Sequence, residues 1–139
     1  MSNLFKVFDV SGSALSANSV RLNAVASNMA NAQMVSGTPE GTYRAKHPVF
    51  ASVMQAFGQD QAVSPVRVAG VVESQAPPHA EYAPNHPLAN EEGYIYRPNV
   101  NMVEEMANMI SASRTYQNNV EVMNTTRQLL LRTLQLGQQ

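Results

Sequence analysis

Hydrophobic residues recur at a seven-residue step near both ends of the chain. The N-terminal rows are Leu4, Ser11, Asn18, Val25 and Phe8, Leu15, Leu22, Met29, and the C-terminal row is Met102, Met109, Tyr116, Met123, Leu130. All eight prolines lie between these segments, from Pro39 to Pro98. Proline breaks helices, and a seven-residue repeat is typical of helices that pair. The pattern therefore predicts two terminal helices that pair with each other around an inserted non-helical domain.

The middle of the chain has the pattern of turns and short strands. β-branched and aromatic residues bounded by Pro, Gly and Asn predict strands at Val49–Met54, Val66–Glu73 and Tyr94–Tyr96. Three short strands form a small sheet at most, so this region should be loop-rich. The predicted fold is mainly α with a small β-rich insertion, and its N- and C-terminal helices pair as a coiled coil. The predicted domains are an N-terminal helix over 1–33, a middle β/loop domain over 34–99 and a C-terminal helix over 100–139.

The C-terminal helix has clear start and stop signals. Asn101 can cap its first turn with Glu104 as the reciprocal partner, and Gly137 is a stop signal at its other end. A second row on the pairing face completes the heptad pattern. This row consists of Met106, Val120 and Leu134, with Ser113 and Arg127 as polar breaks. Breaks of this kind set the register against a specific partner.

The N-terminal helix is almost free of charge. From Val10 to Pro39 the single charged residue is Arg21. A helix on a protein surface normally carries Lys and Glu on its outer face, whereas small uncharged polar groups can be buried when they find hydrogen-bond partners. We therefore expect protein on several sides of this helix. Its Ser, Asn and Gly residues are poor helix formers, so the helix should be marginal alone and form on packing.

The composition excludes several classes of function. Charged residues make up 14% of the chain and the formal net charge is −1, so no overall field attracts nucleic acid or an anionic membrane. Without cysteine there is no disulfide, thiolate metal site or cysteine nucleophile. The first ten residues include Lys6 and Asp9 and lack the apolar core of a secretory signal, and no run is long enough for membrane insertion. If the protein leaves the cytoplasm, we expect another route.

Two rival functions follow from the residues alone. His79, His86 and Glu81 lie close in sequence, as in a metal-assisted hydrolase, but they lack the helical spacing of a ligand pair, and ordinary loop histidines are the favoured interpretation. No catalytic motif is present, so we expect no enzyme, no catalytic residue and no metal or cofactor. The other rival is a soluble coiled-coil adaptor that binds one partner through the Met-rich C-terminal helix. Arg114 and Arg127 are expected in solvated or interface ion pairs.

Two long motifs, one at each end, carry a family resemblance. The first is Ser11-Gly12-x2-Leu15-x-Ala17-x3-Arg21-Leu22-Asn23-x2-Ala26-Ser27-Asn28-x-Ala30-Asn31-Ala32. The second runs from Pro98-Asn99-Val100 through Glu104-Glu105-Met106 and Ser111-Ala112-Ser113-Arg114-x-Tyr116 to Leu134-x-Leu136-Gly137. Both resemble the flagellar basal-body rod, hook and hook-associated axial proteins. Middle segments such as Asn85-His86-Pro87-Leu88-Ala89 are similar to those of the short proximal rod subunits. The resemblance covers nearly the whole chain, and Ala51 to Ser64 is its least family-like part.

The resemblance implies a structural subunit of the bacterial flagellar basal body. Such subunits assemble helically into the proximal rod, a shaft that crosses the periplasm and passes torque from the membrane ring to the hook. Paired terminal helices line the inner tube, and the middle domain forms an outer β-rich layer. The implied partners are copies of itself, other proximal and distal rod subunits, the rod-to-membrane-ring adaptor and the flagellar type III export apparatus. The chain would pass through that apparatus unfolded and without a cleaved signal peptide.

We expect the subunit interface to lie on the two terminal helices. On the N-terminal helix the expected interface residues are Leu4, Phe8, Gly12, Leu15, Ala17, Arg21, Leu22, Asn23, Ala26, Asn28, Met29 and Asn31. On the C-terminal helix they are Met102, Met106, Met109, Arg114, Tyr116, Val120, Met123, Leu130 and Leu134.

Overall fold

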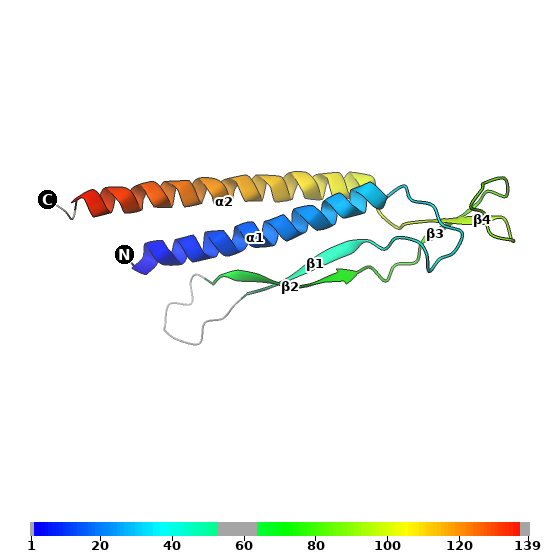
Figure 1. Ribbon diagram of the computed structural model, residues 1–139, viewed down its shortest axis with the longest axis horizontal. Helices are drawn as coiled ribbons and strands as arrows, with labels where there is room; N and C mark the ends of the chain where they lie inside the picture. The colour runs from blue at the N-terminus through cyan, green and yellow to red at the C-terminus, as the bar shows by residue number, and fades with distance from the viewer. Residues whose placement is uncertain (1, 53–63, 137–139) are drawn as a thin grey trace.

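The computed structural model describes residues 2–52 and 64–136. In this part of the chain one long helix precedes four short strands and a second long helix follows them (Figure 1). The elements are α1 (Ser2–Asn31), β1 (Lys46–Ser52), β2 (Val66–Glu73), β3 (His79–Tyr82), β4 (Tyr94–Arg97) and α2 (Met102–Leu136). The predicted arrangement of long terminal helices around a small β-rich insertion is confirmed.

α1 and α2 form an antiparallel pair along the long axis of the molecule. Both ends of the chain lie at the same end of this pair, and the last turns of α2 project beyond the first turn of α1 (Figure 1). At the other end, Oδ1 of Asn101 accepts hydrogen bonds from the N–H groups of Val103 at 3.0 Å and Glu104 at 3.4 Å. The predicted cap by Asn101 is therefore confirmed, whereas the reciprocal bond from the Glu104 carboxylate is not seen among the described residues. The predicted stop at Gly137 lies outside the described residues.

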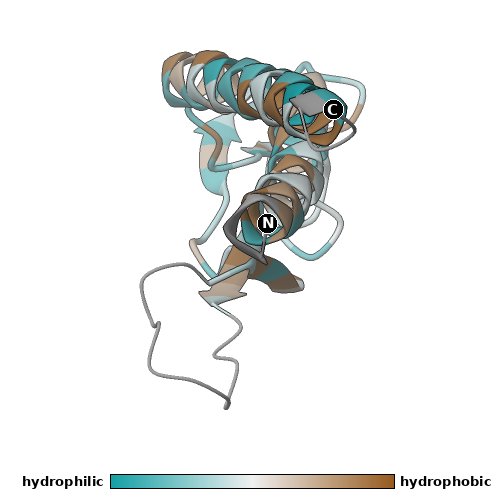
Figure 2. Ribbon diagram, turned by 90° about the vertical axis from the view of Figure 1, so that its left-hand side faces the viewer, coloured by the Kyte–Doolittle hydropathy of each residue, from teal (hydrophilic) through white to brown (hydrophobic). Residues whose placement is uncertain are grey.

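α1 lies between α2 and a β-hairpin. β1 and β2 pair antiparallel, from Lys46 opposite Glu73 to Ser52 opposite Val66. The hairpin packs along the side of α1 that faces away from α2, as the side view and the end-on view both show (Figures 1 and 2). Protein therefore covers two sides of α1, in line with its low charge.

A second two-stranded sheet, formed by β3 and β4, extends from the helix pair along the long axis (Figure 1). Ser36 adds an isolated antiparallel bridge to Tyr96 of β4. Ile95, also on β4, is 1% exposed and is the largest buried apolar side chain of the described residues. The connection after α1 is thereby attached to β4, close to the point where α2 begins.

The predicted strands correspond to β1, β2 and β4. Val66–Glu73 coincides with β2, Tyr94–Tyr96 lies within β4, and Val49–Met54 overlaps β1, which begins earlier at Lys46. Met54 lies outside the described residues. The sequence pattern does not predict β3, because its four residues are all exposed and show no alternation of apolar and polar side chains.

The core is thin and consists mainly of small side chains. Its buried hydrophobic residues are Ala17, Ala24, Val25, Ala45, Ile95 and Ala112. Alanine side chains allow close backbone contact but remove little apolar surface from water. Hydrophobic residues occur in all three layers, the two helices and the hairpin (Figure 2), and many of the larger ones remain exposed. Neither described helix is long and apolar enough to cross a membrane.

Candidate assembly interface

α2 has an inner stripe made of two rows of residues at a seven-residue step. One row is the predicted one: Met102, Met109, Met123 and Leu130 are half-buried, and Tyr116 is 37% exposed. The other row is Glu105, Ala112, Asn119 and Thr126, in which all but the half-buried Asn119 are buried. Two rows with this spacing lie on one face of a helix. This face packs against α1.

The second inner row differs from the predicted row by one position. Met106 and Leu134 are 50% and 47% exposed, so they do not belong to the stripe that packs against α1. A pattern built on apolar residues assigns Met106 to the inner row, because such a pattern does not consider the polar Glu105 beside it. The inner position is occupied instead by Glu105, which is 6% exposed. A polar side chain can occupy such a position when it has a hydrogen-bond partner.

Asn28 of α1 supplies that partner and is the polar centre of the subunit. Its side chain is 1% exposed. Its Oδ1 accepts hydrogen bonds from the backbone N–H of Lys46 at 2.8 Å and from the hydroxyl of Tyr43 at 2.9 Å. Its Nδ2 donates to the backbone carbonyl of Lys46 at 3.0 Å and to Oε2 of Glu105 at 3.2 Å. A side-chain amide has two donor and two acceptor positions, so all four are used.

The amide of Asn28 joins three elements of the fold. Lys46 begins β1, and Glu105 lies in the first turn of α2. A buried polar group without a partner costs about 1–3 kcal/mol, and more when it is charged. Loss of β1 or α2 would therefore leave a donor or acceptor of Asn28 unpaired, and loss of Asn28 would leave Glu105 and the backbone of Lys46 without this partner. The packing of the hairpin and the packing of α2 against α1 depend on each other at this point.

Two further hydrogen bonds tie α1 to its neighbours. Nη2 of Arg21 donates to Oδ1 of Asn108 on α2 at 3.3 Å. The backbone N–H of Val66, at the start of β2, donates to Oγ of Ser13 at 3.1 Å. Both donor–acceptor pairs are partly buried. The low-charge helix is therefore held through its polar side chains as well as through its alanines.

Seven polar side chains of the described helices donate to the backbone of their own helix. They are Ser13, Asn18, Asn31, Thr115, Asn119, Thr126 and Thr133, each 2.7–2.9 Å from a carbonyl oxygen three or four residues earlier. Such a donor does not need water as a partner. Covering it with a neighbouring molecule therefore costs less free energy than covering a donor that has no partner. The helix surfaces are thus polar in composition yet suited to burial.

A stripe of small residues runs along the exposed side of α1. Its exposed members, spaced three or four residues apart on one face, are Ser16, Ser19, Asn23, Ala26 and Ala30. Gly12 continues this stripe, and a Cβ atom added there would meet nothing within 4 Å. The stripe has no large side chain, so another helix can approach it closely. We call these six residues the small-residue stripe.

The outer side of α2 carries large apolar residues that the described part of the subunit leaves uncovered. Val103, Met106 and Ile110 are 74%, 50% and 56% exposed, and their spacing places them on one face. Further along the helix the exposed large apolar residues are Val122, Leu129, Leu131 and Leu134. Of all these, the heptad rows predict only Met106 and Leu134. Two further seven-residue rows would have indicated the others, because Val103, Ile110 and Leu131 lie in one row and Val122 and Leu129 in another.

The predicted interface residues fall into two groups. Some pack within the subunit: Ala17 and Asn28 are buried, and Phe8, Leu15, Arg21, Leu22, Met29, Asn31, Met102, Met109, Val120, Met123 and Leu130 are half-buried. Gly12 is half-buried too, but it belongs to the small-residue stripe. The exposed ones are Asn23, Ala26, Met106, Arg114, Tyr116 and Leu134. Leu4 lies in α1, but its side chain is outside the described part. The exposed residues are available for contacts between molecules, and so are the solvent-accessible parts of the half-buried residues.

The three residues of the metal-site hypothesis, His79, His86 and Glu81, have separate partners. Oε2 of Glu81 is 2.7 Å from Nε of Arg97 in an exposed ion pair. Nε2 of His79 is 3.2 Å from Oδ1 of Asn99, and Nδ1 of His86 accepts a backbone hydrogen bond at 3.1 Å. Within residues 2–52 and 64–136, no three His, Asp or Glu side chains are grouped to hold a metal ion.

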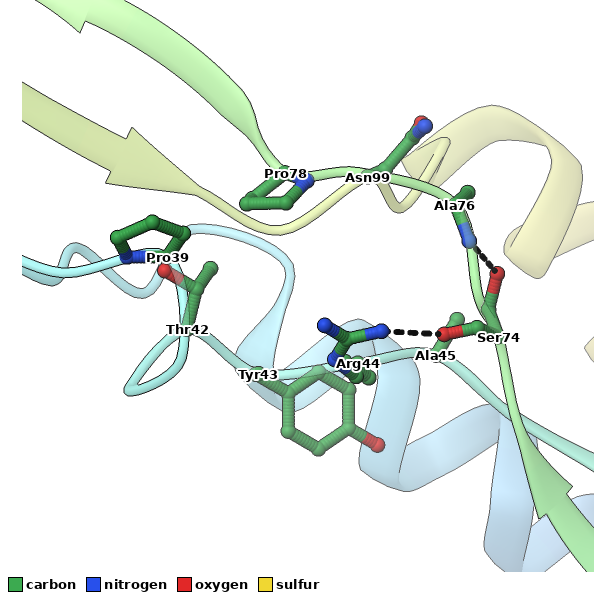
Figure 3. Close-up of a pocket in the computed structure, with 9 residues that line it drawn as sticks. All are labelled: Pro39, Thr42, Tyr43, Arg44, Ala45, Ser74, Ala76, Pro78 and Asn99. Atoms are coloured by element: carbon green, nitrogen blue, oxygen red, sulfur yellow. Dashed lines mark hydrogen bonds between the residues drawn. The ribbon is translucent and has the colours of Figure 1, made fainter.

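A small hollow lies beside the segment that connects α1 to β1 (Figure 3). It is lined by Pro39, Thr42, Tyr43, Arg44, Ala45, Ser74, Ala76, Pro78 and Asn99. Nη1 of Arg44 donates to the carbonyl of Ser74 at 3.4 Å and so connects the segments before β1 and after β2 (Figure 3). The volume of the hollow, about 10 Å³, is close to the minimum that holds one water molecule. This hollow is too small for a substrate or cofactor.

Two family models match the helical ends of the chain. The model described as "Flagella basal body rod protein" matches residues 8–37, which include most of α1. The model described as "Flagellar basal body rod FlgEFG protein C-terminal" matches residues 91–136, which include β4 and α2. These are the two ends whose motifs resemble flagellar axial proteins.

Curated relatives match over nearly the whole chain. The flagellar basal-body rod protein FlgC of Salmonella typhimurium is 53% identical over 135 residues, which cover 97% of this chain and 98% of the relative. FlgC of Yersinia enterocolitica is 51% identical over 136 residues, with 98% and 99% covered. FlgC of Bacillus subtilis is 34% identical over 146 residues, with 96% and 97% covered. The matched length includes both helices and the insertion between them, and the chain therefore belongs to the FlgC family of flagellar basal-body rod proteins.

Proposed function

We propose that this chain is a structural subunit of the proximal rod of the bacterial flagellar basal body. The observation that carries the proposal is its similarity to FlgC rod proteins over nearly the full length. The uncovered apolar residues of α2 and the small-residue stripe of α1 are surfaces on which such a subunit can pack. Its role is mechanical rather than enzymatic and uses no cofactor.

In the rod, the helices within residues 1–33 and 100–139 form the inner-tube domain, and residues 34–99 form an outer layer. α1 and α2 pair there as a coiled coil. The seven-residue step of the inner stripe of α2 supports this pairing. The hydrogen bond between Asn28 and Glu105 supports it too, because a buried polar contact fixes the register of two helices.

Helical assembly requires contacts between unlike surfaces of neighbouring copies. When the rotation between neighbours does not close, such contacts generate a helical tube rather than a ring. Burial of a Val, Leu or Ile side chain stabilises by about 1.5–3 kcal/mol relative to full exposure. Several such residues on α2 can offset the ordering cost of docking one subunit. The self-bonded Ser, Thr and Asn side chains keep the desolvation cost of the same contact low.

The proposed partners are copies of itself, other proximal and distal rod subunits and the rod-to-membrane-ring adaptor. The chain reaches them through the flagellar type III export apparatus and joins a rod that crosses the periplasm. Passage in an unfolded state agrees with the weak helix propensity of α1. Passage in an unfolded state also agrees with the hydrogen bonds of Asn28, because Lys46 and Glu105 reach Asn28 only after the chain has folded.

Complementation of a strain that lacks its own FlgC-family subunit tests this function. The chain should restore swimming, and isolated basal bodies should contain it in complete rods. Ile110→Asp, which alters a 56% exposed apolar residue, should leave the purified subunit folded but restore neither. A soluble adaptor would instead be recovered outside basal bodies with one partner in a fixed ratio. The proposal fails if the wild-type chain forms no rods where the strain's own subunit, supplied in the same way, does.

A further inference from the structure

The β3–β4 end of the molecule presents an apolar surface with acidic charge. We call residues 82–94 the tip. Its exposed large apolar residues are Tyr82, Leu88 and Tyr94, at 66%, 52% and 39% exposed. Glu91 and Glu92 are exposed as well, and they are the only Asp, Glu, Lys or Arg residues of the tip. Glu81, just before it, already has a cationic partner in Arg97.

The tip has a defined shape. Oδ1 of Asn90 accepts hydrogen bonds from the N–H groups of Glu92 at 3.1 Å and Tyr94 at 2.8 Å. The rings of Tyr82 and Tyr94 pack edge to face, with centroids 5.2 Å apart. Gly93 adopts a φ of +82°, which favours glycine. These contacts hold the acidic loop in place, so docking would order few additional groups.

The opposite end of the molecule carries the complementary charge. We call residues 124–135 of α2 the α2 tail; it is the part that ends beyond α1 (Figure 1). Leu129, Leu131 and Leu134 are 49%, 51% and 47% exposed. Arg127 and Arg132 are exposed and are the only Asp, Glu, Lys or Arg residues of the tail. In the described part of the chain neither arginine forms an ion pair.

We propose that the tip of one copy docks on the α2 tail of a second copy. Each surface combines exposed apolar residues with charge of one sign, and the two signs are opposite. Tip against tip or tail against tail would bring like charges together, so the contact joins unlike ends. Because tip and tail lie at opposite ends of the long axis (Figure 1), repetition gives an open head-to-tail series. The inference rests on the proposed function, for which it supplies one contact.

Cysteine cross-linking tests the contact directly. The chain has no cysteine, so an introduced thiol is unique. One chain carries Asn85→Cys in the tip and another carries Gln128→Cys in the α2 tail, and the two are mixed under a mild oxidant. The tip–tail disulfide should form about tenfold or more faster than a control disulfide between Asn85→Cys and Asn118→Cys, at an exposed position of α2 outside the tail, because docking raises the local thiol concentration. Equal rates would overturn the proposal.

Charge exchange between the two surfaces provides the second test. Glu91→Lys with Glu92→Lys in the tip should slow tip–tail cross-linking about tenfold or more, and so should Arg127→Glu with Arg132→Glu in the tail. Mixing the tip variant with the tail variant restores opposite charges and should restore the rate. A variant that simply misfolds would not recover in the mixture. Unchanged rates, or no recovery, would overturn the proposal.

The same variants separate this contact from the proposed function. If a photoreactive cross-linker attached to the tip thiol reacts only with a different protein in isolated basal bodies, the second copy is the wrong occupant. Wild-type complementation without tip–tail cross-linking rejects the contact and leaves the rod function standing. Efficient cross-linking without complementation supports the contact and rejects the function.

Discussion

Asn28 on α1 and Glu105 on α2 are hydrogen-bonded across the helix pair, with 3.2 Å between Nδ2 and Oε2. The two side chains are 1% and 6% exposed. A carboxylate this deeply buried needs a donor, and the amide supplies one while its remaining positions bind Lys46 and Tyr43. The helix pair and the hairpin thus share one buried polar contact.

Asn28→Ala should lower the free energy of unfolding by about 2–4 kcal/mol, because it leaves the Glu105 carboxylate and the backbone groups of Lys46 without their partner. Urea unfolding of the purified chain measures the loss. Amide exchange at Lys46 should accelerate with it, since that N–H donates to Asn28. The matched control is Asn31→Ala, which removes a bond within α1 and should cost about 1 kcal/mol or less. Equal losses would contradict the role of Asn28.

Asn28→Asp keeps the shape of the side chain but brings a second carboxyl group next to Glu105. The new side chain repels the Glu105 carboxyl group, and it no longer donates a hydrogen bond to Glu105 or to the carbonyl of Lys46. The variant should therefore be less stable than the wild type by about 2–4 kcal/mol at neutral pH. Urea unfolding of the two proteins measures the loss. Equal stabilities would contradict a buried contact between positions 28 and 105.

Gly12→Ala and Gly12→Leu separate folding from assembly. Alanine should stabilise the isolated chain by about 0.5–1 kcal/mol, since glycine is a poor helix former and the added Cβ meets nothing within 4 Å. Leucine should also leave the middle domain folded, yet it fills the small-residue stripe and should block incorporation into rods. Ala26→Leu, on the same stripe, should act similarly. Thermal unfolding and complementation are the two measurements. Normal rods with either leucine variant would remove the stripe from the interface.

Gly93→Ala should open the β3–β4 sheet locally, at a cost of about 1–2 kcal/mol. Its φ is +82°, and an added Cβ would lie 2.9 Å from Cε2 of Tyr82. The N–H of Ala83 donates to the carbonyl of Gly93 at 2.9 Å, so its amide exchange should accelerate. The N–H of Glu105, bonded to the carbonyl of Asn101 at 3.0 Å, should be unaffected. Acceleration at both amides would mean that the sheet and the helix pair open together.

The repeat pattern predicts the helices well because the signals for a helix lie within the helix itself and the residues next to it. Met102, Met109 and Met123 recur on one face, and Asn101 caps the helix just before them. The second inner row is not predictable in this way. Met106 and Glu105 are neighbours in sequence, and only the location of Asn28 on another element decides which one is inside. An apolar pattern contains no information on such a polar contact.

β3 is missed for a related reason. His79–Tyr82 has no local strand pattern, and its conformation depends on pairing with β4. Glu81 pairs with Arg97, and the ring of Tyr82 packs on that of Tyr94. These cross-strand contacts join residues that are distant in sequence. Val103 and Ile110 are not predicted by the heptad rows, because the rows describe one face of α2 and these exposed residues lie on another face.

The position of α1 between α2 and the hairpin also affects the order of events during folding. Asn28 and Glu105 are 77 residues apart in sequence, and Ser13 and Val66 are 53 residues apart. Closing such long loops costs entropy before the contacts form, which slows folding. α1 is synthesised first, but it cannot complete its contacts until α2 has been synthesised. A chain truncated before Met102 would leave the α2-facing side of α1 exposed to solvent, even if the hairpin formed.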